Sequence, residues 1–466
     1  MNREDKTAAA HGGVLVELPL GDAAPNFNLE KAVCSHGLFM MAPNHWDPDS
    51  KTLKRPLRPC LDDDETSLMV HISHPPHSIH ALHLRVFGTQ SLSSQQQQSL
   101  LSQVRRMLRL SEEENTRVIE FHKMHEEAKE RGFGRMFRSP TLFEDIIKCM
   151  LLCNCQWSRT LSMAQALCEL QAELQHPLSS ASNVMAENGT ISSCQKTEAN
   201  HFVPKTPSGK ESKRKSGVRK CSKNLANKYA EILAVEDTEI KISSLEILIP
   251  TIPSGDVKQT SYLRGIEDYS GSTIGNFPSP RELARLDEKF LERRCNLGYR
   301  ARRVINFARE VVEGRIQLRE LEFVCGTVSL SDYDKLTEKL RMIDGIGPYT
   351  CANVLMCMGY YHVIPADSET IRHLKQVHAK SSTIRTVQED IENIYGKYAP
   401  FQFLAYWSEM WQFYEERFGN LSEVPHSSYK LITAANMRPI KETGSKRTKL
   451  SVVKDMQDGF TKRMQA

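Results

Sequence analysis

The residues whose types and spacing could do chemistry lie in segment 340–374, around two glycines and a later aspartate. Gly345 and Gly347 flank Ile346, and Pro348 follows directly. Glycine permits left-handed dihedrals and a close approach of another backbone, and proline suits the first turn of a helix. The free N–H groups and the dipole at such a helix start favour an anion, for which a phosphate is the obvious candidate.

Asp367 lies about twenty residues further along the chain, where a new amphipathic pattern begins with Ile371 and Leu374 facing inward. The aspartate is therefore expected at or near the start of a helix. One interpretation is that it serves only as an N-cap, because aspartate is among the preferred capping residues. The glycine hairpin just upstream shifts the balance towards a functional carboxylate.

Apolar spacing predicts the helices that position these residues. One short helix ends at the glycines and a second begins immediately after them, so that a very tight hairpin joins the two. The inward residues are Leu336, Leu340 and Ile343 for the first helix and Ala352, Leu355 and Met358 for the second.

The segment G-I-G-P-Y-T-C-A at 345–352, followed by I-P-A-D at 364–367, resembles the helix-hairpin-helix–GPD motif of the DNA glycosylase superfamily. F-P-S-P-R-E-L-A and L-G-Y-R-A-R-R-V, upstream in the expected order, are also similar to this family. The resemblance covers about 137–170 and 277–420. More weakly, F-N-L-E-K-A-V-C-S-H-G-L-F at 27–39 resembles the N-terminal sheet of the 8-oxoguanine and AlkA-like branches.

The resemblance implies a DNA N-glycosylase of base excision repair, in which Asp367 is the catalytic carboxylate. A fixed carboxylate stabilises the oxocarbenium character of the sugar and can orient water, once the damaged base has left the duplex. The hairpin N–H groups around Gly345, Ile346, Gly347 and Thr350 would hold a DNA phosphate.

No cofactor is required on this interpretation, apart from a monovalent cation that many family members bind on hairpin carbonyls. By position these carbonyls belong to Arg341, Ile343 and Ile346. The iron–sulfur branch of the family ends in four closely spaced cysteines. No cysteine follows Cys357, so we expect no such cluster.

The sequence departs from the family pattern at two positions. Bifunctional members have a Schiff-base lysine where this chain has Tyr349, and a phenol cannot form an imine. The resemblance therefore implies a monofunctional enzyme that leaves an abasic site, with a lyase using another lysine, such as Lys375, as an alternative. Many relatives have D-x-H where this chain has Asp367-Ser368-Glu369, and Glu369 would alter the local electrostatics.

Several further residues are candidates for contacting DNA. Asn154 and Gln156 close an apolar helix; in the family such amides fill the hole left by the extruded base, and the alternative is helix capping. Tyr299 and Arg300 stand near a helix start in a basic segment suited to phosphate or to acidic neighbours. The base pocket is expected to include Tyr349, Asn353 and, from an aromatic-rich helix at 401–418, Trp411.

Two groups of potential metal ligands are better explained without a metal. The histidines between 71 and 83 match strand faces and a proline-rich turn better than a converging ligand set, and Cys149, Cys153 and Cys155 lack a second cluster with ligand spacing. Twelve scattered cysteines indicate reduced thiols in an intracellular protein.

The pattern along the chain predicts an α+β fold, with an antiparallel sheet domain followed by an all-α helix-hairpin-helix domain that carries a long disordered insertion. Strands are expected at 36–41, 67–72 and 79–87. The expected parts are a flexible start (1–25), the sheet domain (26–92), a first helical part (93–170), the basic insertion (171–276), the hairpin part (277–425) and a basic tail (426–466).

Bulk properties restrict the partners. The net charge is only +4, so a nucleic-acid role must rest on local basic clusters, and no apolar run reaches membrane-spanning length. The cluster at 213–220 is interpreted as a nuclear import signal or a DNA tether, or else as a solvated charge run. We expect a nuclear monomer that binds damaged double-stranded DNA and hands its product to an abasic-site endonuclease.

Two classes of function remain open at this point. The first is an active monofunctional glycosylase, and the second is a catalytically inactive helix-hairpin-helix protein that binds distorted DNA. The retained Asp367 favours the enzyme. Alkylated purines, oxidised guanine and deaminated bases are all candidate substrates. An aromatic residue at Tyr349 could stack on an electron-poor base, which makes the AlkA-like comparison more attractive.

Overall fold

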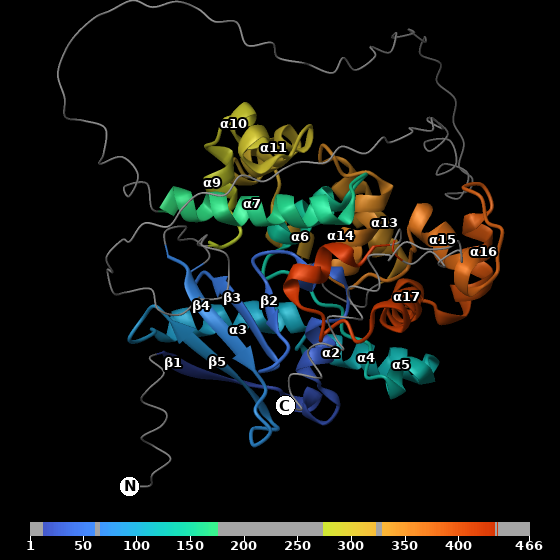
Figure 1. Cartoon of the computed structure of the whole chain (residues 1–466), viewed down its shortest axis with the longest axis horizontal. Helices are drawn as coiled ribbons and strands as arrows, with labels where there is room; N and C mark the ends of the chain where they lie inside the picture. The colour runs from blue at the N-terminus through green and yellow to red at the C-terminus, as the bar shows by residue number, and fades with distance from the viewer. Residues whose placement is uncertain (1–12, 61–65, 176–273, 323–328, 434–435, 437–466) are drawn as a thin grey trace, which may run out of the picture. The chain divides into compact units, whose positions relative to one another are not determined.

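The computed structural model describes residues 13–60, 66–175, 274–322, 329–433 and 436. They form an α+β fold with one five-stranded antiparallel sheet in the order β1-β5-β4-β3-β2 (Figure 1). The strands are β1 (Val14–Pro19), β2 (His45–Asp47), β3 (Thr52–Leu57), β4 (Leu68–Ser73) and β5 (Ala81–Phe87).

The last strand follows directly from its sequence pattern. Leu82, Leu84 and Val86 of β5 are fully buried, while the residues between them are partly exposed, as the strict alternation predicted. Pairing with β4 places Val86 opposite Val70 and Leu84 opposite Ile72, so one continuous apolar face is built. The predicted strands at 67–72 and 79–87 are therefore confirmed.

The expected strand at 36–41 is wrong, because the chain there forms the 3₁₀ helix η2 (Gly37–Met40). Leu38, Phe39 and Met40 are all buried in succession, and a short continuous apolar run does not distinguish a strand from a buried turn. The side chain of His36 accepts a hydrogen bond from the amide of Leu38, which begins the turn.

The start of the chain differs from the flexible segment expected at 1–25. Residues 14–19 form edge strand β1 along β5, with Val16 and Leu18 buried, and η1 (Gly21–Asn26) follows. Residues 171–175, expected in the insertion, belong to helix α7, and the expected tail begins with η4 (His426–Leu431), where Tyr429 is buried. Residues 176–273, with the basic cluster 213–220, and residues 437–466 lie outside the described residues.

The other regular elements of the described chain are helices. Before residue 176 they are α2 (Leu29–Val33), α3 (Ser94–Leu108), α4 (Glu112–Met124), α5 (Glu126–Glu130), α6 (Leu142–Leu152) and α7 (Trp157–Gln175). After residue 273 they are α9 (Pro280–Ala284), α10 (Glu288–Cys295), α11 (Arg300–Val312), α12 (Leu318–Glu322), α13 (Leu330–Arg341), α14 (Pro348–Met358), α15 (Ser368–Val377), α16 (Val387–Tyr395), η3 (Gly396–Tyr398) and α17 (Gln402–Phe418).

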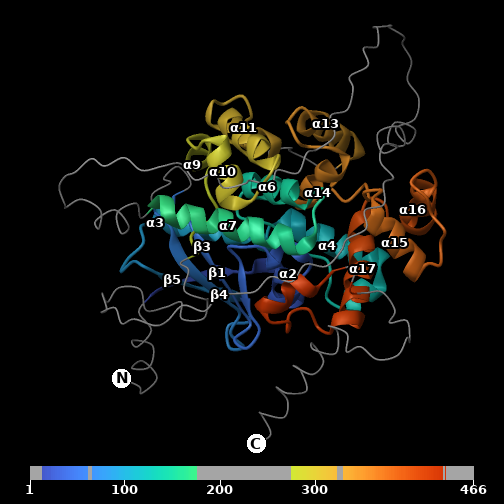
Figure 2. The ribbon, with the colours of Figure 1, turned by 45° about the horizontal axis from the view of Figure 1, so that its top comes forward.

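Helices from distant parts of the sequence pack together. Both views show α9, α10 and α11, in yellow, beside the green helix α7 (Figures 1 and 2). Helix α14 packs between α6 and α13, and a single buried apolar cluster runs from the sheet through these helices. No helix in the described ranges combines the length and apolar character that crossing a bilayer requires.

A buried charge cluster ties the sheet to α6, the helix on which α14 rests. Arg55 on β3 and Lys148 on α6 are fully buried, and they contact the carboxylate of Glu144 at 3.0 and 2.7 Å. Burial alone would raise the pKa of Glu144, but the two cations outweigh it and lower that pKa to about 2. All three charges depend on one another, because a lone buried charge is very unfavourable.

Replacing Glu144 by Ala should lower the free energy of unfolding by about 3–5 kcal/mol, because it leaves two buried cations without their counter-charge. Denaturant unfolding at neutral pH measures the loss. The exposed pair Glu126–Lys129 provides the control, since Glu126→Ala should cost less than about 1 kcal/mol. The contribution of Glu144 to the free energy of unfolding should disappear as the pH falls from the normal pKa of a glutamate towards 2. Equal losses of stability in Glu144→Ala and Glu126→Ala would contradict the role of Glu144 as the counter-charge of the two buried cations.

Candidate functional site

The two glycines of the hairpin between α13 and α14 differ in their surroundings: Gly345 is the inner glycine, which packs against Arg303, and Gly347 is the outer glycine, which faces open space. Gly345 has φ +91°, and a Cβ atom there would lie 2.6 Å from Cδ of Arg303. Gly347 is extended, and a Cβ atom there would meet no described residue within 4 Å. Gly347 is the N-cap of α14 and provides no side-chain cap, so the first N–H groups of this helix remain available to a ligand.

Two further hairpin residues, Thr350 and Ile346, face the interior of the protein or the turn itself. Thr350 is fully buried, and its Oγ1 atom has no hydrogen-bond partner in the described part of the chain. The amide of Ile346 donates to the carbonyl of Ile343 over 3.1 Å, which closes the turn. The ligands predicted for a cation are the carbonyls of Arg341, Ile343 and Ile346. Because a carbonyl oxygen has two lone pairs, Ile343 can accept this hydrogen bond and still bind a cation.

The opposite end of α14 is held by two arginines, of which Arg109 is buried and Arg138 is partly buried. Arg109, which is 1% exposed, donates to the carbonyls of Met356 and Cys357 over 2.9 and 2.8 Å, and Arg138 donates to Cys357 over 3.0 Å. Glu114 pairs with the other side of the Arg109 guanidinium at 2.8 Å. Positive charge therefore compensates the negative end of the α14 dipole, while its positive end is left open at Gly347.

Asp367 is the half-buried N-cap of α15, and its carboxylate accepts a hydrogen bond from the amide of Thr370 over 2.8 Å. The Thr370 hydroxyl donates to the carbonyl of Pro365 over 2.7 Å and lies 3.1 Å from the hydroxyl of Tyr406 on α17. The expected position at a helix start is confirmed. Thr370 and Tyr406, which were not predicted, fix the chain on either side of the carboxylate.

Burial is the main cause of the pKa shifts of both Asp367 and Tyr349. Burial raises the pKa of Asp367, hydrogen bonds from Thr370 oppose the shift, and the negative charge of Glu369 adds to it. Burial also raises the pKa of Tyr349, and the charge of Asp367 contributes to that shift, so Tyr349 is a neutral phenol at physiological pH. Asn353 is buried and donates to the carbonyl of Tyr349 over 2.9 Å, which is a bond within α14.

Arg300 does not have the role expected for it. It is 3% exposed and donates to the carbonyls of Cys153 and Asn154 in the turn between α6 and α7, so it holds that turn and cannot lie on an open DNA-contacting face. Tyr299 is 53% exposed and lies under the guanidinium groups of Arg300 and Arg303, at 4.6 and 4.9 Å. Arg303 continues to the hairpin, where it packs against Gly345.

The α6–α7 turn exposes both predicted amides. Asn154 has φ +47°, a conformation that asparagine tolerates better than most residues, and both Asn154 and Gln156 are exposed. Arg300, Tyr299 and Arg303 connect this turn to the hairpin. The contacts of these three residues therefore link the turn that carries the predicted amides to the glycine hairpin.

An aromatic group is formed by residues of two elements, η2 with its N-cap and α17. Trp411 is buried against Phe39 and Trp407, so it serves mainly as packing. His36, which the sequence did not single out, has its ring 5.7 Å from that of Trp407. His36 Nε2 and Trp407 Nε1 are buried without a partner in the ranges described, which is unusual for polar atoms.

His36 and Trp407 lie between the other parts of the site. Gly37, next to His36, contacts Trp157, the first residue of α7, and Trp407 follows Tyr406, which contacts Thr370. Burial lowers the pKa of His36 to about 4, so its ring is neutral at physiological pH. Because Nδ1 accepts the Leu38 amide, Nε2 carries the hydrogen, and the two unpaired groups are both donors.

No family model and no curated protein matches the chain. Solved structures that resemble it include MBOgg1 in complex with a low-affinity DNA ligand (14% identity, TM-score 0.46, 86% of this chain and 98% of that one). Others are the Clostridium acetobutylicum 8-oxoguanine glycosylase/lyase in its apo-form (11%, 0.45, 83% and 93%) and the Archaeoglobus fulgidus 3-methyladenine DNA-glycosylase (14%, 0.47, 85% and 98%). Similarity this low assigns no activity to the chain.

Gly347→Ala should leave the protein as stable as the wild type, because the new methyl group meets open space at a conformation that any residue adopts. It should nevertheless weaken duplex DNA binding, since the methyl group obstructs close approach of a phosphate. Gly345→Ala is the contrast: a left-handed alanine costs about 1–2 kcal/mol, before the contact with Arg303 is counted. Unfolding and DNA-binding titrations distinguish the two; unchanged DNA binding by a folded Gly347→Ala variant would exclude the hairpin as the phosphate site.

Two substitutions, Asp367→Asn and Asp367→Ala, separate the contribution of the capping hydrogen bond to stability from the contribution of the carboxylate charge. The raised pKa of Asp367 means that folding favours the protonated acid, so the associated stability is lost as the pH rises through that pKa. At pH 7 asparagine keeps the cap without the buried charge and should be at least as stable as wild type, whereas alanine should lose about 1 kcal/mol. Denaturant unfolding measures both; equal losses would mean that the ionised cap itself stabilises α15.

Proposed function

We propose that this protein is a monofunctional DNA N-glycosylase of base excision repair, which flips a damaged base out of duplex DNA and hydrolyses its N-glycosidic bond. The observation that carries this proposal is the carboxylate of Asp367. It is half-buried at a helix start with a raised pKa, and it follows helix α14, whose hairpin has an open outer glycine. A solvated cap would have no reason to lie where its charge is unfavourable, whereas catalytic carboxylates commonly do.

Each step of the proposed reaction has a residue suited to it. The amide groups of Gly345, Gly347 and Thr350 hold a phosphate, whereas the predicted Ile346 amide is already bonded within the turn. Asn154 and Gln156 occupy the space vacated by the base. The extruded base stacks on Tyr349. As the bond to the sugar breaks, the Asp367 carboxylate stabilises the oxocarbenium character of the deoxyribose and orients the attacking water.

The residue at the Schiff-base position supports hydrolysis without strand cleavage. Tyr349 replaces the Schiff-base lysine of bifunctional relatives, and its phenol forms no imine. Lys375 is exposed and lies eight residues beyond Asp367 on α15, about 12 Å along the helix axis. A monovalent cation on the carbonyls of Arg341, Ile343 and Ile346 would add positive charge near the bound phosphate.

For the damaged base we propose a chemical class and no single lesion. His36 Nε2–H and Trp407 Nε1–H would suit acceptor atoms of an extruded base, and Tyr349 would suit an electron-poor ring. Alkylated purines combine these features. The abasic product would pass to an endonuclease, and action on nuclear DNA as a monomer completes the proposal.

Base release from duplexes with single lesions tests the proposal. The panel should contain alkylated purines, oxidised guanine and deaminated bases, with the wild type and Asp367→Asn compared in enzyme excess and the products treated with alkali. We expect one class to be released by the wild type and release to fall at least about 100-fold in Asp367→Asn, as removal of one electrostatic stabiliser typically gives.

Other outcomes would overturn parts of the proposal. Strand cleavage without alkali, together with an adduct trapped by borohydride, would contradict the monofunctional assignment, and loss of that adduct in Lys375→Ala would identify the lysine. Release that survives in Asp367→Asn would remove Asp367 from the chemistry. Binding to distorted duplexes without release from any of them would favour the inactive DNA-binding protein.

A further inference from the structure

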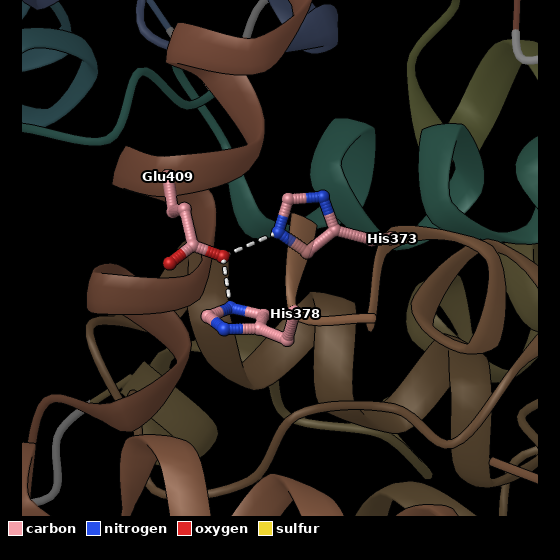
Figure 3. Close-up of side chains that lie close together, drawn as sticks. All are labelled: His373, His378 and Glu409. Carbon is pink, nitrogen blue, oxygen red and sulfur yellow. Dashed lines mark hydrogen bonds and ion pairs between the residues drawn. The ribbon is translucent and has the colours of Figure 1, made fainter. Parts of the chain in front are cut away.

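Three metal-ligating side chains converge between α15 and α17, and none of them is among the residues assigned to base release. His373 lies within α15, His378 directly after its last residue, and Glu409 on α17. Figure 3 shows both imidazole rings pointing towards the same carboxylate oxygen. The distances from Oε1 of Glu409 to the two Nε2 atoms are 2.6 Å for His373 and 2.7 Å for His378.

The surroundings make this group unlike an ordinary surface ion pair. His373 is completely buried, and His378 and Glu409 are each about one-quarter exposed at the side chain. The hydroxyl of Tyr395 also donates to Oε1 of Glu409, over 2.6 Å. Although burial acts to raise it, hydrogen bonds from His373 and Tyr395 lower the pKa of Glu409 to about 2, so the carboxylate is ionised at physiological pH.

The donor set fits a divalent transition metal. The three ligand atoms lie within 4.8 Å of one another, and two imidazole nitrogens with one carboxylate oxygen are a set that binds Zn²⁺ while leaving a position open for water. A cavity of about 100 Å³ adjoins the group and is lined by His378, Tyr395 and Glu409. It gives an ion a route to the ligands and room for a bound water.

We propose that His373 Nε2, His378 Nε2 and a carboxylate oxygen of Glu409 bind Zn²⁺, with water from the adjoining cavity as the fourth ligand. Tetrahedral bonds of about 2.1 Å separate neighbouring ligand atoms by roughly 3.4 Å, so each nitrogen moves less than about 1 Å from its present contact. Tyr395 retains its hydrogen bond to the carboxylate and orients it, as outer-sphere partners of metal ligands do.

The proposed ion has a structural role that does not depend on the proposed function. It fastens the C-terminal half of α15 to α17, and Asp367 is the residue that begins α15. The site has three protein ligands, and Nδ1 of His373 lacks a partner among the residues described, so the outer hydrogen bond that usually strengthens an imidazole ligand is missing there. We therefore expect weaker affinity than in a four-ligand zinc finger.

Metal titration of the full chain tests this inference. After chelator treatment and removal of the chelator, Zn²⁺ should raise the unfolding temperature of the wild type in a concentration-dependent way, because it binds the folded state. Co²⁺ should give the visible absorption of a tetrahedral nitrogen–oxygen site without the strong ultraviolet bands of thiolate ligation. That spectrum separates this site from the twelve cysteines of the chain.

Matched variants identify the ligands. His378→Gln removes a partly exposed ligand, and Glu409→Gln keeps a hydrogen-bond acceptor for the two histidines and Tyr395 but removes the anionic ligand. Both should abolish the Zn²⁺-dependent shift and the Co²⁺ absorption while retaining the far-ultraviolet circular dichroism of the wild type. His80→Gln, an exposed histidine far from this group in sequence, should retain both signals.

Two results would overturn the inference. A wild-type protein that shows neither a Zn²⁺-dependent shift nor Co²⁺ absorption would make the group a hydrogen-bonded anchor only. Signals that persist unchanged in folded His378→Gln and Glu409→Gln would assign the metal to other ligands. Neither result bears on base release, since these measurements use no DNA and Asp367 is unchanged throughout.

Discussion

The rest of the site depends on one electrostatic constraint: the C-terminal end of α14 is neutralised by arginines, whereas its N-terminal end is left without a cap. Arg109 and Arg138 supply positive charge to its last carbonyls, while its first turn begins at an uncapped glycine. A helix fixed in this way directs its positive end and its free N–H groups outward. The same fixed helix carries Tyr349 on its first turn, and the charge of the Asp367 carboxylate contributes to the raised pKa of this phenol.

Asp367 shows how a local structural role and a chemical one coincide. As an N-cap it is an ordinary helix start, and the hydrogen bond to Thr370 would serve stability in any protein. Burial works against the charge at the same position, and residues that oppose local stability in this way are characteristic of functional sites. The contacts of Thr370 and Tyr406 keep the carboxylate in place despite that opposition.

Features set by neighbouring residues were predictable from the sequence, and features set by distant contacts were not. The glycine hairpin, the cap at Asp367 and the alternation of β5 all follow from local rules. Arg300 was misassigned because its burial depends on carbonyls about 150 residues earlier in the chain. The group of His373, His378 and Glu409 has no recognisable spacing and forms only when α17 packs against α15.

The central claim, that the Asp367 carboxylate stabilises positive charge on the sugar, can be measured without knowing the lesion. Duplexes with a cationic pyrrolidine abasic analogue mimic the oxocarbenium state, and the neutral tetrahydrofuran analogue has the same shape without the charge. The account predicts that the wild type binds the cationic duplex more tightly, and that Asp367→Asn lowers this preference at least tenfold. An equal preference in both proteins would contradict the account.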